Sequence, residues 1–150
     1  MKKTYKSSVS KRSYGMLLLM VVILIAPFLS IEEFSIGDLR NTGFLIYIII
    51  TFLIIILLFW IYFGTYYTIE NNYLHHRSGP FFGKIKISSI RKINYHSGWY
   101  VPVFYKPSTD TVGLIITYNK YDDIYFSAKD RDSLVNDLLK INPEIQVIKN

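Results

Sequence analysis

Histidines are the first residues to consider for chemistry, because the sequence contains three of them and no cysteine. His75 and His76 are adjacent, and adjacent side chains on a strand point to opposite faces, so the two do not easily share a metal. No His-x-x-x-His spacing lies near them, and His96 stands alone before Gly and a Trp. We therefore expect packing or surface roles for these three side chains and no metal site.

Two patterns that are typical of catalysis are incomplete. The run Gly79-x-x-x-Gly83-Lys84 is one residue shorter than a phosphate-binding loop, and Ile85 stands where Ser or Thr would bind Mg²⁺. No Gly-x-Ser-x-Gly nucleophile motif occurs. We therefore expect no enzyme and no cofactor, an expectation that a metal or nucleotide bound to the purified protein would reverse. The acidic side chains of the second half are typical of turns and helix caps: Asp122, Asp123, Asp130 and Asp132.

Basic side chains are the remaining chemical feature. The chain has 17 Lys and Arg against 11 Asp and Glu, and residues 64–100 carry five cations against the single acid Glu70. Cations near a membrane attract anionic inner-leaflet lipid at about 1 kcal/mol each. An equally weighted alternative is that they enforce topology and solvate a strand face. Nucleic acid binding is disfavoured, because no recognised motif is present. The candidate lipid- or partner-binding residues are Lys84, Lys86, Arg91, Lys92, Trp99 and Tyr100.

Two apolar runs fill much of the first part of a chain of 150 residues that is 51% hydrophobic. Residues 43–63 hold no charge, and as a helix they would span about 31 Å, which matches a hydrocarbon core of about 30 Å. Residues 14–31 would span about 27 Å. A cleaved signal peptide is the alternative for this first run, but bulky residues follow Ala26 where the peptidase requires small ones. We predict two transmembrane helices, the first of them retained.

The charges that flank these runs predict the orientation. Residues 1–13 contain five cations and no acid, whereas residues 32–42 contain three acids and only Arg40 as a cation. Short segments that are rich in Lys and Arg stay in the cytoplasm. We therefore expect a basic cytoplasmic tail at 1–13, a short extracytoplasmic loop at 32–42, and a multi-pass cell-membrane protein with both termini in the cytoplasm.

The pattern changes to a period of two in residues 64–150, which predicts a cytoplasmic domain of short antiparallel strands. Near its end, Ser127-x-x-Asp130 resembles a capping box, and Leu134, Leu138 and Ile141 recur at helical spacing before Asn142-Pro143. The predicted fold is an α+β membrane protein: a two-helix transmembrane hairpin, then a small antiparallel β-barrel or split sheet with a C-terminal capping helix. Strands are expected at 65–69, 73–77, 84–87, 90–95, 113–118 and 124–127.

Several of these runs resemble one family. Residues 67–74 (YTIENNYL), Ser78-Gly79 and residues 86–93 (KISSIRKI) resemble the opening of bacterial PH-like domains of the YyaB-like type. The second half is similar in its runs LIITY, DIYFSA and the leucines before Asn142-Pro143, and Tyr5-Lys6-Ser7 resembles the family's lead-in. The resemblance covers nearly the whole chain, including two membrane helices. It departs at residues 96–112, where family members usually carry a shorter connection.

The resemblance implies a PH-type split barrel closed by a helix. Related membrane-anchored PH-like proteins include a self-immunity factor against a secreted antimicrobial peptide, which makes immunity a hypothesis by analogy. We expect a non-catalytic, membrane-anchored module that binds inner-leaflet lipid or a protein partner, with protection against a membrane-active peptide as its specific form. The alternative is a structural docking subunit of a larger membrane protein complex.

Overall fold

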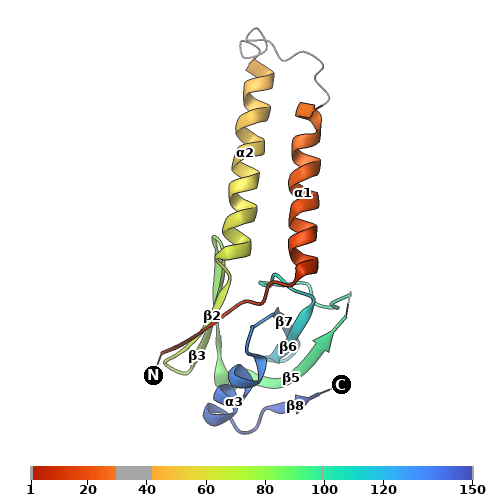
Figure 1. Cartoon of the computed structure of the whole chain (residues 1–150). Coiled ribbons are helices and arrows are strands. Elements are labelled where there is room, and N and C mark those ends of the chain that lie inside the picture. Colours follow the sequence, from red (N-terminus) through yellow and green to blue (C-terminus); the bar gives the residue numbers. More distant parts are fainter. Residues whose placement is uncertain (1, 30–41, 99, 150) are drawn as a thin grey trace.

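Two long helices stand on a folded lobe that consists of two sheets and a short helix (Figure 1). The computed structural model describes residues 2–29, 42–98 and 100–149. Helix α1 is Lys11–Leu29 and helix α2 is Thr42–Phe63. Both are long and apolar enough to cross a membrane, and most of their side chains are exposed. The predicted loop 32–42 lies outside the described residues except for its last position, as do the last two residues of the first predicted span.

Helices α1 and α2 pack side by side as a pair, called the helical hairpin below (Figure 1). The Tyr47 hydroxyl donates to the carbonyl of Leu24 at 3.1 Å. Nearer the lobe, the Tyr62 hydroxyl donates to the carbonyl of Ser13 at 3.2 Å. Hydrogen bonds between two helices fix which faces of the helices pack together.

Within the described residues, eight strands form the two sheets of the lobe. In the first sheet the order is β1-β2-β3-β4 and every pair is antiparallel. In the second the order is β7-β6-β5-β8, with β8 parallel to β5 and the other pairs antiparallel. The six expected strands are confirmed, and the two outermost in sequence were not expected. The bounds are β1 Lys3–Lys6, β2 Tyr66–Glu70, β3 Tyr73–Ser78, β4 Phe81–Lys86, β5 Ile90–Ser97, β6 Val112–Tyr118, β7 Asp122–Phe126 and β8 Gln146–Ile148.

Strand β1 changes how the chain is organised. It lies in the stretch where we expected a basic tail, yet it pairs with β2 in the register Tyr5↔Tyr67. The helical hairpin is therefore inserted between two neighbouring strands of one sheet (Figure 1). A four-residue strand with a single buried side chain, Tyr5, is too short to show a period of two. Its pairing partner is also far along the sequence.

The C-terminal helix α3, Arg131–Ile141, closes one end of the core. Leu134, Val135 and Leu138 are buried, whereas Ile141 is 41% exposed, so the buried stripe is narrower toward the C-terminus than expected. The expected capping box is wrong in position: Asp130 is the N-cap and accepts from the backbone N–H of Ser133 at 3.0 Å. Ser127 is instead buried before the helix.

The lobe has two ends that differ in their neighbours. At the distal end, far from the helical hairpin, Asn142 of the α3 C-cap donates its amide to the carbonyls of Ile87 and Ile90. The β2–β3 turn lies there too, because the N–H of Ile87 bonds to Asn72. At the proximal end the β3–β4 turn and the loop after β5 lie next to the hairpin (Figure 1).

Candidate functional site

The β3–β4 turn is held against the last turns of α2. Gly79 has φ +57°, and a Cβ atom built on it would lie 3.0–3.2 Å from atoms of Ile61, including backbone N and Cα. The Thr65 hydroxyl donates to the Ile61 carbonyl at 2.6 Å and lies 3.0 Å from the Ser78 hydroxyl. Only glycine combines this backbone conformation with so close an approach. The level of the turn relative to α2 is therefore fixed.

The long loop after β5 lies at the same end. The Thr109 hydroxyl donates to the carbonyl of Ser8, and the Ser8 hydroxyl donates to the carboxylate of Asp110, each at 2.8 Å. Val101 and Val103 pack on Tyr125 of the second sheet. This loop contains two of the predicted site residues. Tyr100 is 74% exposed, and Trp99 lies outside the described residues.

Exposed side chains on the first sheet form one continuous surface, because paired residues of antiparallel strands point to the same side. Nearest the helical hairpin, the register aligns Lys6 with Tyr66, Tyr66 with Arg77, and Arg77 with Phe82. One row further on, it aligns Thr68 with His75 and His75 with Lys84. Their neighbours Tyr67, Leu74, His76 and Ile85 point into the core. We call this surface the outer face; its members are Lys6, Tyr66, Tyr73, His75, Arg77, Phe82, Lys84 and Lys86.

The outer face is hollowed over β2, β3 and β4. A groove of about 730 Å³ is lined by residues that include Tyr66, His75, Arg77, Phe82 and Lys84. A second hollow of about 400 Å³ shares Tyr66 with it and continues along Lys6, Tyr62 and Phe63. The groove therefore combines two cationic side chains with aromatic walls at the proximal end of the lobe.

The four predicted cations are not brought together. Lys84 and Lys86 share the outer face, and the Lys84 ammonium lies 5.2 Å from the centre of the Tyr73 ring. Arg91 and Lys92 belong to β5 of the other sheet, where they line a hollow of about 370 Å³ at the distal end. The 3-10 turn at Ile87–Ser89 separates the two pairs, because it carries the chain from one sheet to the next.

The distribution of charge along the sequence does not reveal that Lys6, Tyr66, Arg77 and Phe82 belong to one surface. Arg77 was counted among the cations but was not singled out. The alternation in residues 73–78 and 81–86 was the available signal, since it places Arg77 and Phe82 on the same side as Lys84 once the hairpin register is known. No comparable signal existed for Lys6, which depends on the unexpected β1.

The adjacent histidines point to opposite faces, as the sequence predicted. His75 lies on the outer face, whereas the His76 ring packs between Tyr105 and Phe126, with centroid distances of 5.5 Å to each. Burial, and secondarily the neighbouring His75, lowers the pKa of His76 to about 4, so it is neutral at physiological pH. Within the ranges that the structure describes, no group of three His, Asp or Glu side chains could hold a metal.

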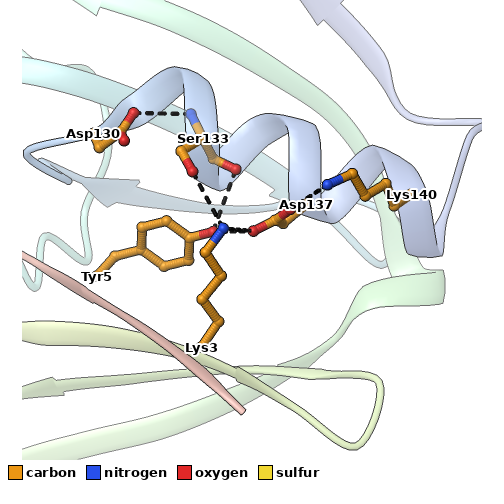
Figure 2. Close-up of polar contacts among 6 residues, drawn as sticks. All are labelled: Lys3, Tyr5, Asp130, Ser133, Asp137 and Lys140. Atoms are coloured by element: carbon orange, nitrogen blue, oxygen red, sulfur yellow. Dashed lines mark hydrogen bonds and ion pairs between the residues drawn. The ribbon is translucent and has the colours of Figure 1, made fainter. Parts of the chain in front are cut away.

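A polar cluster at the distal end ties β1 to α3 (Figure 2). Lys3 and Tyr5 of β1 both donate to the Asp137 carboxylate, and Lys140 donates to its other oxygen at 2.9 Å. Hydrogen bonds from Lys3, Tyr5 and Lys140 hold the pKa of Asp137 well below its ordinary value. A carboxylate that is saturated by three donors fastens strand to helix, and its arrangement points to structure rather than to proton transfer.

Comparisons with known proteins agree with this architecture. Two family models, each described as a bacterial PH domain, match residues 65–142 and residues 14–100. No curated protein and no solved structure matches the chain. Membership of such a family indicates a binding module for lipids or proteins, and domains of this kind are generally non-catalytic. On the strength of these two matches and of the fold, the chain belongs to the bacterial PH domain family.

Proposed function

We propose that this protein is a non-catalytic, membrane-anchored module whose PH-like domain binds anionic lipid or a protein partner at the cytoplasmic face of the cell membrane. The observation that carries the proposal is the insertion of the helical hairpin between β1 and β2. An anchor attached by a single flexible linker leaves a domain free to turn. Here two strands of one sheet lead into the two helices, so the same end of the domain always faces the bilayer.

Charge supports the proposed orientation. The segments next to the lobe ends of α1 and α2 are basic, with Lys11 and Arg12 at the start of α1 and no acid before them. Acids gather in the sequence between the two helices instead. This distribution follows the positive-inside rule. It favours a cytoplasmic location for the lobe and for both termini.

Two measurements test the anchoring and the orientation. The full chain should stay with membranes during alkaline carbonate extraction, and a reporter fused after Asn150 should be active only as a cytoplasmic fusion. Release of the chain by carbonate would contradict membrane spanning. Activity of an exported reporter would contradict the orientation while leaving the anchor intact.

A narrower form of the proposal is protection against a membrane-active peptide, and it rests on the resemblance to YyaB-like and immunity proteins alone. Deletion of the gene should then raise susceptibility to at least one such peptide, and unchanged susceptibility across a broad panel would remove this form. The docking-subunit alternative predicts a stoichiometric protein partner after purification in mild detergent. Lipid binding predicts co-purifying anionic lipid instead.

A further inference from the structure

The groove on the outer face lies at the level of the lipid headgroups. This inference rests on the proposed function, since it requires α2 to span the bilayer. Trp60 and Tyr62 at the end of α2 are typical of the membrane interface. Gly79 contacts Ile61, which lies between them, so the β3–β4 turn reaches the same depth. Strands rise about 3.4 Å per residue, which places the row of Arg77 and Phe82 about 7 Å further from the membrane centre.

The headgroup layer has a comparable thickness. A bilayer of about 40–45 Å with a hydrocarbon core of about 30 Å leaves about 5–8 Å of headgroups on each side. Phe82 is 80% exposed and Phe81 is 55% exposed, beside the turn that reaches this layer. Exposed aromatic side chains in such a position favour the boundary between headgroups and acyl chains.

The cations of the groove are arranged to receive an anion. Arg77 donates through Nε to the carbonyl of Gly79 at 3.1 Å, which holds its guanidinium toward the turn. Among the residues that the structure describes, no carboxylate forms an ion pair with Arg77 or Lys84. Among the described residues, the acid on the outer face is Glu70, which lies opposite Tyr73 and pairs with Lys2 at 3.5 Å. A planar guanidinium and a mobile ammonium are the usual partners of a phosphate group.

We propose that this groove is a binding site for an anionic phospholipid of the adjoining leaflet. Arg77 binds the phosphate, and Lys84, two residues further along the sheet from the membrane, adds its flexible ammonium from the cytoplasmic side of the headgroup. The Tyr66 hydroxyl lies on the wall beside the phosphate, and Phe82 lies against the glycerol and upper acyl chain. The β3–β4 turn enters the headgroup layer together with the end of α2. The distal cations Arg91 and Lys92 take no part, because they belong to the other sheet at the far end of the lobe.

Lipid retention by the full chain tests the cation pair. Purified in mild detergent and analysed by native mass spectrometry, the wild-type chain should retain phosphatidylglycerol and should not retain phosphatidylcholine. The double variant Arg77→Gln/Lys84→Gln should bind phosphatidylglycerol at least about tenfold more weakly. The matched control Arg91→Gln/Lys92→Gln removes the same charge at the distal end and should retain the lipid. Equal loss in both variants, or no loss in either, would overturn the site.

Soluble glycerol 3-phosphate separates a lipid site from a general phosphate site. At a large excess it should displace no phosphatidylglycerol, because it lacks the acyl chains that contact Phe82. Displacement would overturn the assignment to a lipid. Loss of a co-purifying protein from the Arg77→Gln/Lys84→Gln variant, with lipid retention unchanged, would assign the surface to a protein partner and would likewise overturn it.

Single-cysteine labelling tests the depth, and the absence of native cysteine makes it direct. A polarity-sensitive dye on Phe82→Cys in the reconstituted full chain should be quenched by lipids with a spin label near the headgroup. Dye on Tyr121→Cys, an exposed residue in the distal β6–β7 turn, should not be quenched. Dye on Ile49→Cys inside α2, measured with lipids that carry the spin label deep in the acyl chain, reports the anchor itself.

The three labels keep the two proposals apart. Quenching at position 49 without quenching at position 82 would overturn the lipid site and leave the membrane anchor standing. Absence of quenching at position 49 would overturn the anchor, and the proposed function with it. Quenching at both 49 and 82, but not at 121, supports both.

Discussion

The proximal and distal ends of the lobe both carry many charged side chains, but they use them differently. At the distal end the charges form pairs within the protein: Asp137 with Lys3 and Lys140, and Asp132 with Lys149. On the outer face, Arg77 and Lys84 form no ion pair within the described residues, and they line the groove over β2, β3 and β4. Arg91 and Lys92 at the distal end also form no ion pair within the described residues. The comparison therefore teaches that unpaired cations indicate a binding surface only together with a second feature, here the aromatic walls of the groove.

The largest expected effect on stability comes from a substitution at the distal end. Asp137→Asn removes a charge that accepts from Lys3 and Tyr5 and leaves the Lys3 ammonium without its carboxylate. We expect the free energy of unfolding of the full chain in micelles to fall by about 2–3 kcal/mol. Denaturant unfolding measures it, with Glu144→Gln on the surface as the control. An effect below about 0.5 kcal/mol would show that β1 is not fastened through this carboxylate.

An intermediate effect comes from pH and the buried His76. Its folded pKa of about 4 lies below the ordinary value of 6.5, so the unfolded chain binds more protons between these values. Stability is therefore present above pH 6.5 and is lost as the pH falls toward 4, by about 1–2 kcal/mol between pH 7 and pH 5. Thermal unfolding at the two pH values measures this loss.

Two variants identify the histidine that causes this pH dependence of stability. His76→Leu should flatten the profile between pH 7 and pH 5, because the buried titrating group is gone, whereas His75→Gln should keep it. A profile that is unchanged by His76→Leu would place the titrating group elsewhere in the chain.

The smallest expected effect concerns the proximal end. Gly79→Ala places a methyl group against the α2 backbone at a positive φ, and it should cost about 1 kcal/mol and loosen the β3–β4 turn. Headgroup quenching of the dye at position 82 should decrease. Gly15→Ala on α1 is the control, since a Cβ atom there has nothing within 4 Å. Equal quenching in both variants would show that this contact does not set the depth of the turn.

Much of the fold could be predicted from the sequence, and the reason is local pattern. The long apolar runs predict α1 and α2, and alternation as in Lys84-Ile85-Lys86-Ile87 predicts the inner strands, where Ile85 and Ile87 are indeed buried. The two strands that were missed, β1 and β8, have four and three residues. Elements this short owe their structure to distant partners, so their own sequence carries little information.

The candidate site could be predicted only in part, for the same physical reason. Lys84 and Lys86 were correctly assigned to one strand face, because that depends on neighbouring positions alone. Grouping them with Arg91 and Lys92 followed the order of the sequence, whereas the chain changes sheet between the two pairs. Lys6 and Tyr66 meet across a register that the sequence does not display.

The insertion of two helices between β1 and β2 also constrains biogenesis. The ribosome makes β1 first, but its partner β2 emerges only after both helices have been synthesised. The first sheet therefore cannot be completed until both apolar segments have left the ribosome, and Lys3–Lys6 stays unpaired during that time. A chain that lacks β1 would leave one edge of β2 open to pairing with other chains. Under the proposed function, completion of this sheet follows the insertion of both helices into the membrane.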